Sequence, residues 1–243
     1  MLFDQYAQIL KSAIDEICLT QKDKILQAAR MVRDVLAADG LIYVFGCGHS
    51  HILSEETFYR AGGLACVAPI LYPPLMLHEG AAESSRLEKE PRLAEKVLSQ
   101  YSLTKNDMLF CLSTSGINSV PIELAEAVQK QGIPTVAICS SAYFDDPSRC
   151  PNGKHLYEVA DLWLDNLAPH GDAALLPQGA PVRTTPISTI TGAFLLNSIL
   201  AEGTELALKD GVNVPIYLSG NIPGGAEKNT TLIQRFQPRI RHL

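Results

Sequence analysis

Leu41-Ile-Tyr-Val-Phe-Gly-Cys-Gly-His-Ser50 is the stretch that decides the fold of this chain. Its first five residues form a short, continuous apolar run, which is typical of a strand buried on both faces in a parallel sheet. The glycines that follow allow a sharp turn, and a helical segment comes next. The stretch therefore predicts a strand–turn–helix unit of an α/β protein.

The same unit recurs along the chain. Further strands are predicted over residues 64–71, 108–112, 133–139 and 162–164. Helices are predicted over residues 3–19, 22–38, 120–131 and 188–209, with Thr20 as N-cap of the second. Strands that alternate with helices indicate βαβ crossovers and a parallel sheet covered on both faces. The polar segments 140–154 and 169–186 are predicted to be long loops.

Composition restricts the class of protein. The 243 residues are 47% hydrophobic, which suits one α/β domain or two small ones. No apolar run reaches 18 residues, and the N-terminus lacks the pattern of a secretory signal, so we expect a cytoplasmic protein without a membrane span. The six cysteines form no Cys-x-x-Cys pair, which favours a reducing compartment over a disulfide framework.

The net charge is −6, which argues against a nucleic-acid partner. It also means that an anionic ligand gains little from the field of the whole protein. Any phosphate site must therefore be built locally, from backbone N–H groups and hydroxyls.

The first turn, Gly46 to Ser50, has the features of such a site. Glycines at Gly46 and Gly48 let the backbone approach a ligand closely, and the following helix start presents unpaired N–H groups to an anion. Ser50 adds a hydroxyl donor. The alternative is a tight turn in which Ser50 only caps its own helix.

The second turn, Ser113-Thr-Ser-Gly-Ile-Asn-Ser119, also lies between a predicted strand and a helix. A helix cap needs one hydroxyl, whereas Ser113, Thr114 and Ser115 offer three, followed by the amide of Asn118. Both turns follow the carboxyl ends of strands in one sheet, where open α/β folds bind ligands. The motifs Gly-x-x-x-x-Gly-Lys-Ser/Thr and Gly-x-Gly-x-x-Gly are absent, which disfavours nucleotide binding.

These two turns resemble the sugar isomerase (SIS) domain family, on Val44 to Ser50 and Leu112 to Asn118. The resemblance covers roughly residues 20–210. It implies a flavodoxin-like three-layer αβα sandwich with a five-stranded parallel sheet and N-terminal helices. It also implies a phosphate on the serine-rich loop, and homodimers or homotetramers. Asn118 stands where the family usually has a last hydroxyl.

Several branches are similar. The N-terminal helices and first turn resemble phosphoheptose isomerases, although residues 188–209 lack the histidine of their late helix. The segment His78 to Ser84 resembles part of the N-acetylmuramic acid 6-phosphate etherases. The whole chain is most similar to a bacterial SIS-domain family of the UPF0309 type. We expect residues 1–40 to form a helical segment, 41–215 the SIS domain and 216–243 a C-terminal tail.

Isomerisation and ether elimination both remove a proton next to a carbonyl, so both need a carboxylate or imidazole poised near neutral pH. Glu79 and Glu83 flank a small-residue stretch and would share one helix face. Glu55 follows the first turn, with Glu56 beside it. These four acids are candidates for the base, and ordinary solvated surface acids are the alternative.

His49 and His51 lie beside the predicted phosphate loop and could polarise a sugar oxygen, bind a metal or cap the helix. No third metal ligand is evident, so we predict no metal site. His78 and His170 are further candidates for acid or base, and Arg183 could touch a ligand.

The sequence thus predicts a phosphosugar-binding enzyme without a cofactor, and aldose–ketose isomerisation of a sugar or amino-sugar phosphate is favoured. The alternatives are a lyase or etherase of the N-acetylmuramic acid 6-phosphate type, a non-catalytic sugar-phosphate sensor, and a nucleotide-binding Rossmann protein.

Overall fold

Five parallel strands form one central sheet in the computed structural model, which describes all of residues 1–243. The spatial order is β2 (Val67–Ile70), β1 (Ile42–Gly46), β3 (Met108–Leu112), β4 (Thr135–Cys139) and β5 (Leu162–Asp165). This order, 2-1-3-4-5, is that of flavodoxin-like sheets. The structure therefore confirms the predicted fold class.

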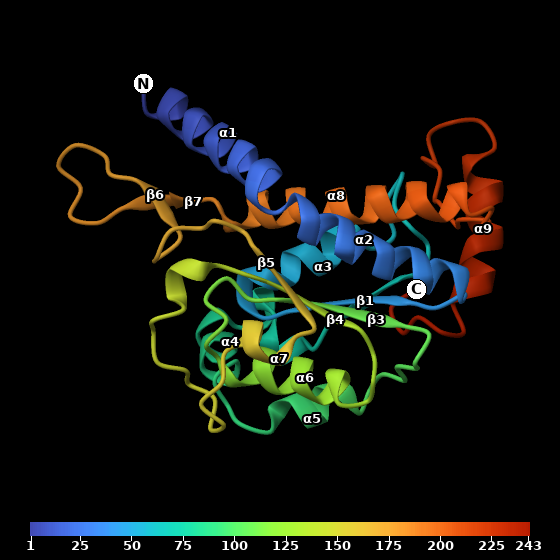
Figure 1. Cartoon of the computed structure of the whole chain (residues 1–243), viewed down its shortest axis with the longest axis horizontal. Helices are drawn as coiled ribbons and strands as arrows, with labels where there is room; N and C mark the ends of the chain where they lie inside the picture. The colour runs from blue at the N-terminus through green and yellow to red at the C-terminus, as the bar shows by residue number, and fades with distance from the viewer.

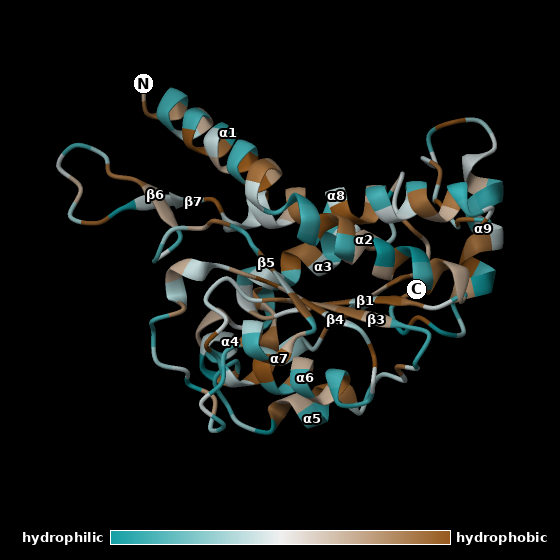
Figure 2. Cartoon of the chain, in the orientation of Figure 1, coloured by the Kyte–Doolittle hydropathy of each residue, from teal (hydrophilic) through white to brown (hydrophobic).

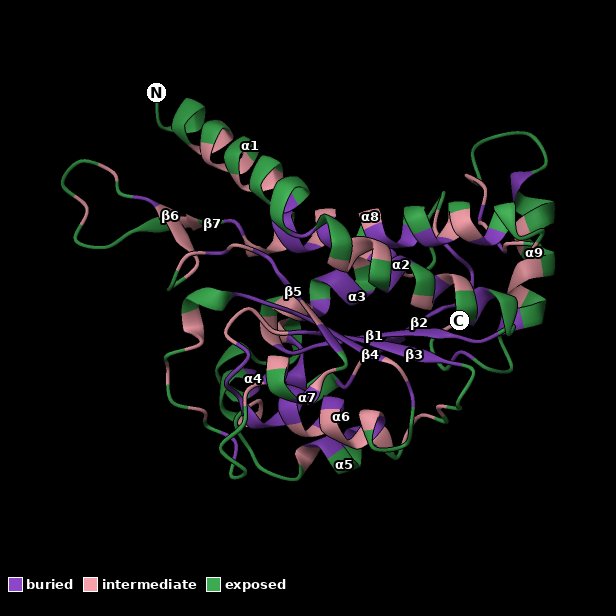
Figure 3. Cartoon of the chain, in the orientation of Figure 1, coloured by how far each residue is buried: buried purple, intermediate pink, exposed green.

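Burial on both faces explains why these segments are strands. Every residue of β1, β3 and β4 is buried, as their unbroken apolar runs require (Figure 3). The strands are also among the most hydrophobic segments in Figure 2. Pro69 lies in β2, an edge strand, where a missing backbone donor is tolerated.

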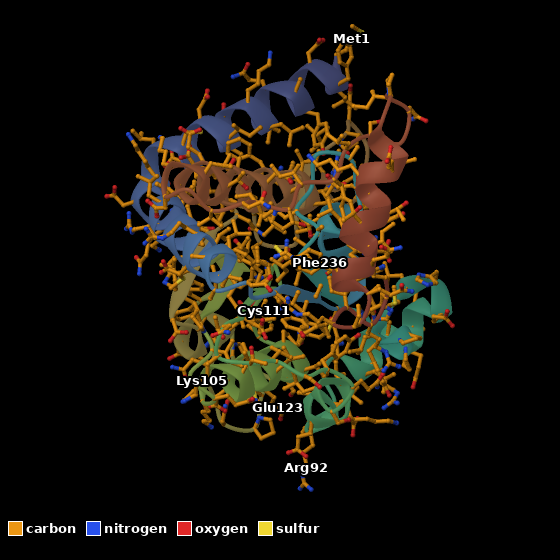
Figure 4. All side chains as sticks on the ribbon, turned by 90° about the vertical axis from the view of Figure 1, so that its right-hand side faces the viewer. Met1, Arg92, Lys105, Cys111, Glu123 and Phe236 are labelled. Carbon is orange, nitrogen blue, oxygen red and sulfur yellow. The ribbon has the colours of Figure 1, made fainter.

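Helices cover both faces of the sheet, which makes three layers (Figure 1). On one face lie α2 (Lys22–Ala37), α3 (Ile52–Thr57) and α8 (Ser188–Lys209). On the other lie α5 (Leu93–Leu98), α6 (Ser119–Gln129) and α7 (Leu156–Val159), with α4 (Ala81–Leu87) near them. The buried core extends through these layers, and Cys111 lies at its centre in Figure 4.

Helices α2 and α8 lie unusually close together, because α8 has a glycine where they meet. A Cβ on Gly203 would lie 2.5 Å from Cγ1 of Val32, well inside a normal contact. Gly203 thus allows the approach that buries Val32 and its neighbours.

Helix α1 (Leu2–Thr20) projects from the body, beside an antiparallel hairpin of β6 (Ala173–Leu175) and β7 (Thr184–Pro186) (Figure 1). The hairpin lies in the segment that the sequence predicts as loop. None of the helices is long and apolar enough to cross a membrane.

Two local expectations are wrong. Thr20 ends α1 and donates its hydroxyl to the Glu16 carbonyl, so Gln21 is the N-cap of α2. Residues 64–66 lie outside β2, because Leu64 makes an antiparallel bridge to Ile216 instead.

The C-terminal segment forms α9 (Gly225–Phe236), which is anchored by the fully buried Phe236 (Figure 4).

Candidate functional site

A pocket of about 280 Å³ opens at the carboxyl ends of β1 and β3. Both glycine- and serine-rich turns contribute to its wall, so the structure brings the two predicted loops together around one hollow. The predicted binding residues that line it are Gly48, Ser50, Ser113, Thr114, Ser115 and Asn118.

The first turn has a geometry that only glycine allows. A Cβ on Gly46 would lie 2.6 Å from the carbonyl oxygen of Ser50, and Gly48 has a positive φ of 54°. Gly46 itself lies behind the pocket wall, where it permits the turn. Residues Gly48–His51 form a single 3-10 turn (η1) that leads into α3.

The second turn is held by its own polar groups. The hydroxyl of Ser113 accepts a hydrogen bond of 3.2 Å from the amide of Gly116, which has a positive φ of 64°. The carbonyl of Thr114 accepts from the amide of Ser140, 2.8 Å away. The hydroxyls of Thr114 and Ser115 line the pocket and are not used by these contacts.

Glu88 enters the pocket from the end of α4, and no sequence pattern singled it out. Its Oε1 accepts a hydrogen bond of 2.9 Å from Nδ2 of Asn118, whose Oδ1 accepts one of 2.9 Å from Nη1 of Arg149. Burial raises the pKa of Glu88, against the opposing positive charges of Lys89 and Arg149.

The pocket wall carries no lysine or arginine. Its ionisable side chains are Glu88, Asp172, His49, Tyr143 and Cys47. Burial, with the negative charge of Glu88, holds the pKa of the Cys47 thiol well above its ordinary value. Cys47 is therefore a neutral thiol and not a nucleophile at neutral pH.

Three of the predicted catalytic acids lie outside the pocket wall. Glu83 forms an exposed ion pair with Arg86, 2.7 Å away, which lowers the pKa of Glu83. Glu79 is exposed, and its Oε1 lies 3.8 Å from Nε2 of His78. Glu55 lies 3.4 Å from Nε2 of the buried His51.

The predicted histidines differ in their positions and contacts. His49 is exposed and lines the pocket. His51 is buried and makes a short hydrogen bond to the carbonyl of Gly48, so it stabilises the turn. His170 pairs with Asp146, 3.0 Å away. The structure gathers no cluster of three or more metal-ligating side chains.

Residues from the chain's second half complete the pocket. Asp172, Ser188 and Thr189 line it beside the start of α8, with Asn166 at the end of β5. Asp172 accepts hydrogen bonds from the amides of Ile187 and Ser188, at 3.1 and 2.9 Å, and so holds the start of α8. The sequence predicts segment 169–186 as a long loop, but it does not indicate which of its residues faces the pocket.

Comparison with known proteins shows the family of this chain. The model of the SIS domain matches residues 5–140, more than half of the chain. The chain belongs to the SIS-domain family. Its curated relatives are UPF0309 proteins. One from Geobacillus kaustophilus is 43% identical over 240 residues, which cover 98% of this chain and 96% of the relative. Another from Caldanaerobacter subterraneus is 39% identical over an alignment of 246 positions, which covers 100% of this chain and 100% of the relative.

Solved structures of SIS proteins share the fold. Phosphoheptose isomerase GmhA from Neisseria gonorrhoeae matches with a TM-score of 0.55 at 17% identity, covering 84% of this chain and 100% of that chain. The NanR protein of Vibrio vulnificus complexed with ManNAc-6P matches with a TM-score of 0.52 at 16% identity. That match covers 98% of this chain and 69% of NanR.

Proposed function

We propose that this SIS-domain protein binds a phosphorylated sugar and isomerises it between aldose and ketose forms. The observation that carries the proposal is one pocket lined by both turns, with hydroxyls and a helix start facing the same hollow. Backbone N–H groups and small hydroxyls satisfy phosphate oxygens without a cationic side chain. The substrate class is a sugar or amino-sugar phosphate, because most of the residues that line the pocket are polar.

The fold neighbours support this ligand class. One is a phosphoheptose isomerase, and another was solved with an amino-sugar phosphate bound. The pocket also supplies groups for proton transfer, namely the carboxylate of Glu88 and the imidazole of His49. Isomerisation needs no organic cofactor, since the proton that is removed can return one carbon away.

A sugar-phosphate sensor is the second candidate, because the NanR match covers nearly all of this chain. An etherase is disfavoured by the exposed positions of Glu79 and Glu83. An enzyme would convert the phosphosugar to a product, whereas a sensor would only bind it.

Self-association is part of the proposal. Large apolar side chains are exposed at the tips of α1 and of the β6–β7 hairpin, where they project from the body: Leu2, Phe3, Leu176 and Val182. A group of exposed apolar side chains marks an interaction surface, and a second copy of this chain is the occupant that we propose. The assembly would be a homodimer or homotetramer.

Thermal shift tests the ligand class. Melting temperatures of the wild type are measured with fructose 6-phosphate, glucosamine 6-phosphate, N-acetylmannosamine 6-phosphate, a heptulose 7-phosphate, NAD and ATP. A phosphosugar should raise the melting temperature, since it binds only the folded state. The Ser113→Ala/Ser115→Ala variant should lose that shift. The control variant Ser99→Ala should keep it, because Ser99 is exposed and lies outside the pocket wall. A shift with ATP or NAD alone would contradict the proposal.

A further inference from the structure

Glu88 links the two loops of the pocket. Its Oε1 accepts from Nδ2 of Asn118 in the second loop, and its backbone carbonyl accepts from the amide of Val120, 3.1 Å away. Its other oxygen, Oε2, points at the first loop, 4.0 Å from the position that a Cβ on Gly48 would take. The carboxylate is thus set between the loops, with one oxygen tied down and one directed across the pocket.

Hydrogen bonds through Asn118 and Arg149 fix this orientation. The amide of Asn118 donates to Glu88 and accepts from Arg149, so a flipped amide would lose both hydrogen bonds. Arg149 is anchored in turn, because its amide donates to the carbonyl of Ile117 at 2.8 Å and its carbonyl accepts from the hydroxyl of Ser119 at 3.1 Å. A surface glutamate needs no such support.

The environment of Glu88 differs from that of the other acids near the pocket. Glu79 and Glu83 are about half exposed, and Glu83 is paired with Arg86, whereas Glu88 is half-buried in the pocket wall. Burial raises the pKa of Glu88 toward neutral pH, where a carboxylate is a more effective base.

We infer that Glu88 is the catalytic base of this pocket, with Asn118 and Arg149 as positioning residues; the inference rests on the proposed function. The carboxylate removes the proton at C2 of the open-chain aldose phosphate. The electrons of that C–H bond form the C1–C2 double bond, and those of the carbonyl move to O1, which takes a proton from His49 or water.

The resulting enediol then collapses in the other direction. O2 loses its proton to the group that protonated O1, the C2–O2 double bond forms, and C1 takes a proton from the Glu88 carboxyl group, which exchanges its proton with solvent while the enediol is bound. Atoms and electrons balance without an oxidant or cofactor. The ketose formed retains the phosphate throughout.

The variant Glu88→Gln keeps an acceptor for Asn118 but cannot take a proton. For the phosphosugar that shifts the wild-type melting temperature, incorporation of solvent deuterium next to the carbonyl is followed by NMR. We expect E88Q to lose exchange by at least about 100-fold, the contribution of a general base, while its affinity stays within a few-fold. The control E90Q makes the same change of charge two residues away, on an exposed acid paired with Arg86, and should exchange at the wild-type rate.

Two further variants separate a base from a structural contact. Glu88→Asp keeps a carboxylate and should retain more exchange than E88Q, and it serves also if E88Q fails to fold. Asn118→Ala removes the donor that stabilises the carboxylate, so the acid limb of the rate–pH profile should move to higher pH.

The possible results of these experiments test different parts of the proposal. Absence of any phosphosugar shift in the wild type would overturn the proposed function. Binding without exchange in the wild type would overturn the role of Glu88 and leave the sensor. Exchange that survives in E88Q and E88D alike, or that is lost in E79Q or E83Q instead, would overturn Glu88 as the base.

Discussion

At the scale of single residues, burial controls the chemistry of the cysteines. Cys18 is exposed, and the other five are buried thiols. Burial raises the pKa of Cys66 to about 12 and raises the pKa of Cys111 as well, so neither forms a thiolate at neutral pH.

Thiol titration with Ellman's reagent at pH 8 tests this. One thiol per native chain should react quickly, and six should react after unfolding in guanidinium chloride. The Cys18→Ser variant should abolish the fast phase. A fast thiol that remains in that variant would show that at least one of the five buried cysteines becomes accessible in the native chain.

The raised pKa of Glu88 also makes a prediction about stability. The folded state holds the proton of Glu88 more tightly than the unfolded state, so the contribution of this group to stability falls as pH rises from its ordinary value of 4.5 through the folded pKa. Urea unfolding at pH 7 should show E88Q at least as stable as the wild type. The difference should shrink on acidification toward pH 4.5. A growing advantage of E88Q at acid pH would contradict the direction of the shift.

The position of Glu88 in the pocket could not be predicted from the sequence. The phosphate loops could be predicted, because glycines and hydroxyls after apolar strands are local signals. Glu88 lies in the charged run Glu88-Lys89-Glu90, which reads as a solvated surface. Its place in the pocket wall and its hydrogen bond with Asn118 depend on tertiary structure. Whether Glu55, Glu79 and Glu83 take part stays a prediction for the exchange assay.

At the scale of elements, helix α8 was predicted over its full length, Ser188–Lys209, because its apolar residues recur through six turns. The β6–β7 hairpin was not predictable, since strands of three residues carry no periodicity. The prediction of Thr20 as an N-cap was wrong because threonine can also end a helix, where its hydroxyl donates to the carbonyl four residues back.

The α2–α8 contact predicts a substitution whose sign runs against helix propensity. Gly203→Ala gains about 1 kcal/mol of propensity, but its Cβ would overlap Val32, and overpacking costs about 1–3 kcal/mol. Chemical denaturation should therefore show a net loss of stability. Val32→Ala removes Cγ1 but keeps the Val32 Cβ, which would lie 2.6 Å from the new methyl group, so Gly203→Ala should also destabilise the Val32→Ala variant. A stabilised single variant would mean that the helices can separate without loss.

At the scale of the whole molecule, the projecting α1 and hairpin predict an assembly. Light scattering should give a multiple of the 26.4 kDa chain. The variants Phe3→Ser and Val182→Ser should reduce that mass, because both remove exposed apolar contacts. Leu208→Ser is the matched control: Leu208 is also exposed, at the far end of α8, and its loss should leave the mass unchanged. A wild type that stays monomeric at high concentration would remove the second copy from the proposal.

The pocket wall, which lacks lysine and arginine, has a consequence for how the ligand arrives. A phosphosugar dianion must approach a protein of charge −6, and two carboxylates, Glu88 and Asp172, line the pocket that receives it. Sodium chloride screens this repulsion, since the Debye length falls to about 3 Å at 1 M. Titration calorimetry should therefore find affinity unchanged or tighter as salt rises, whereas a site clamped by cationic side chains would weaken.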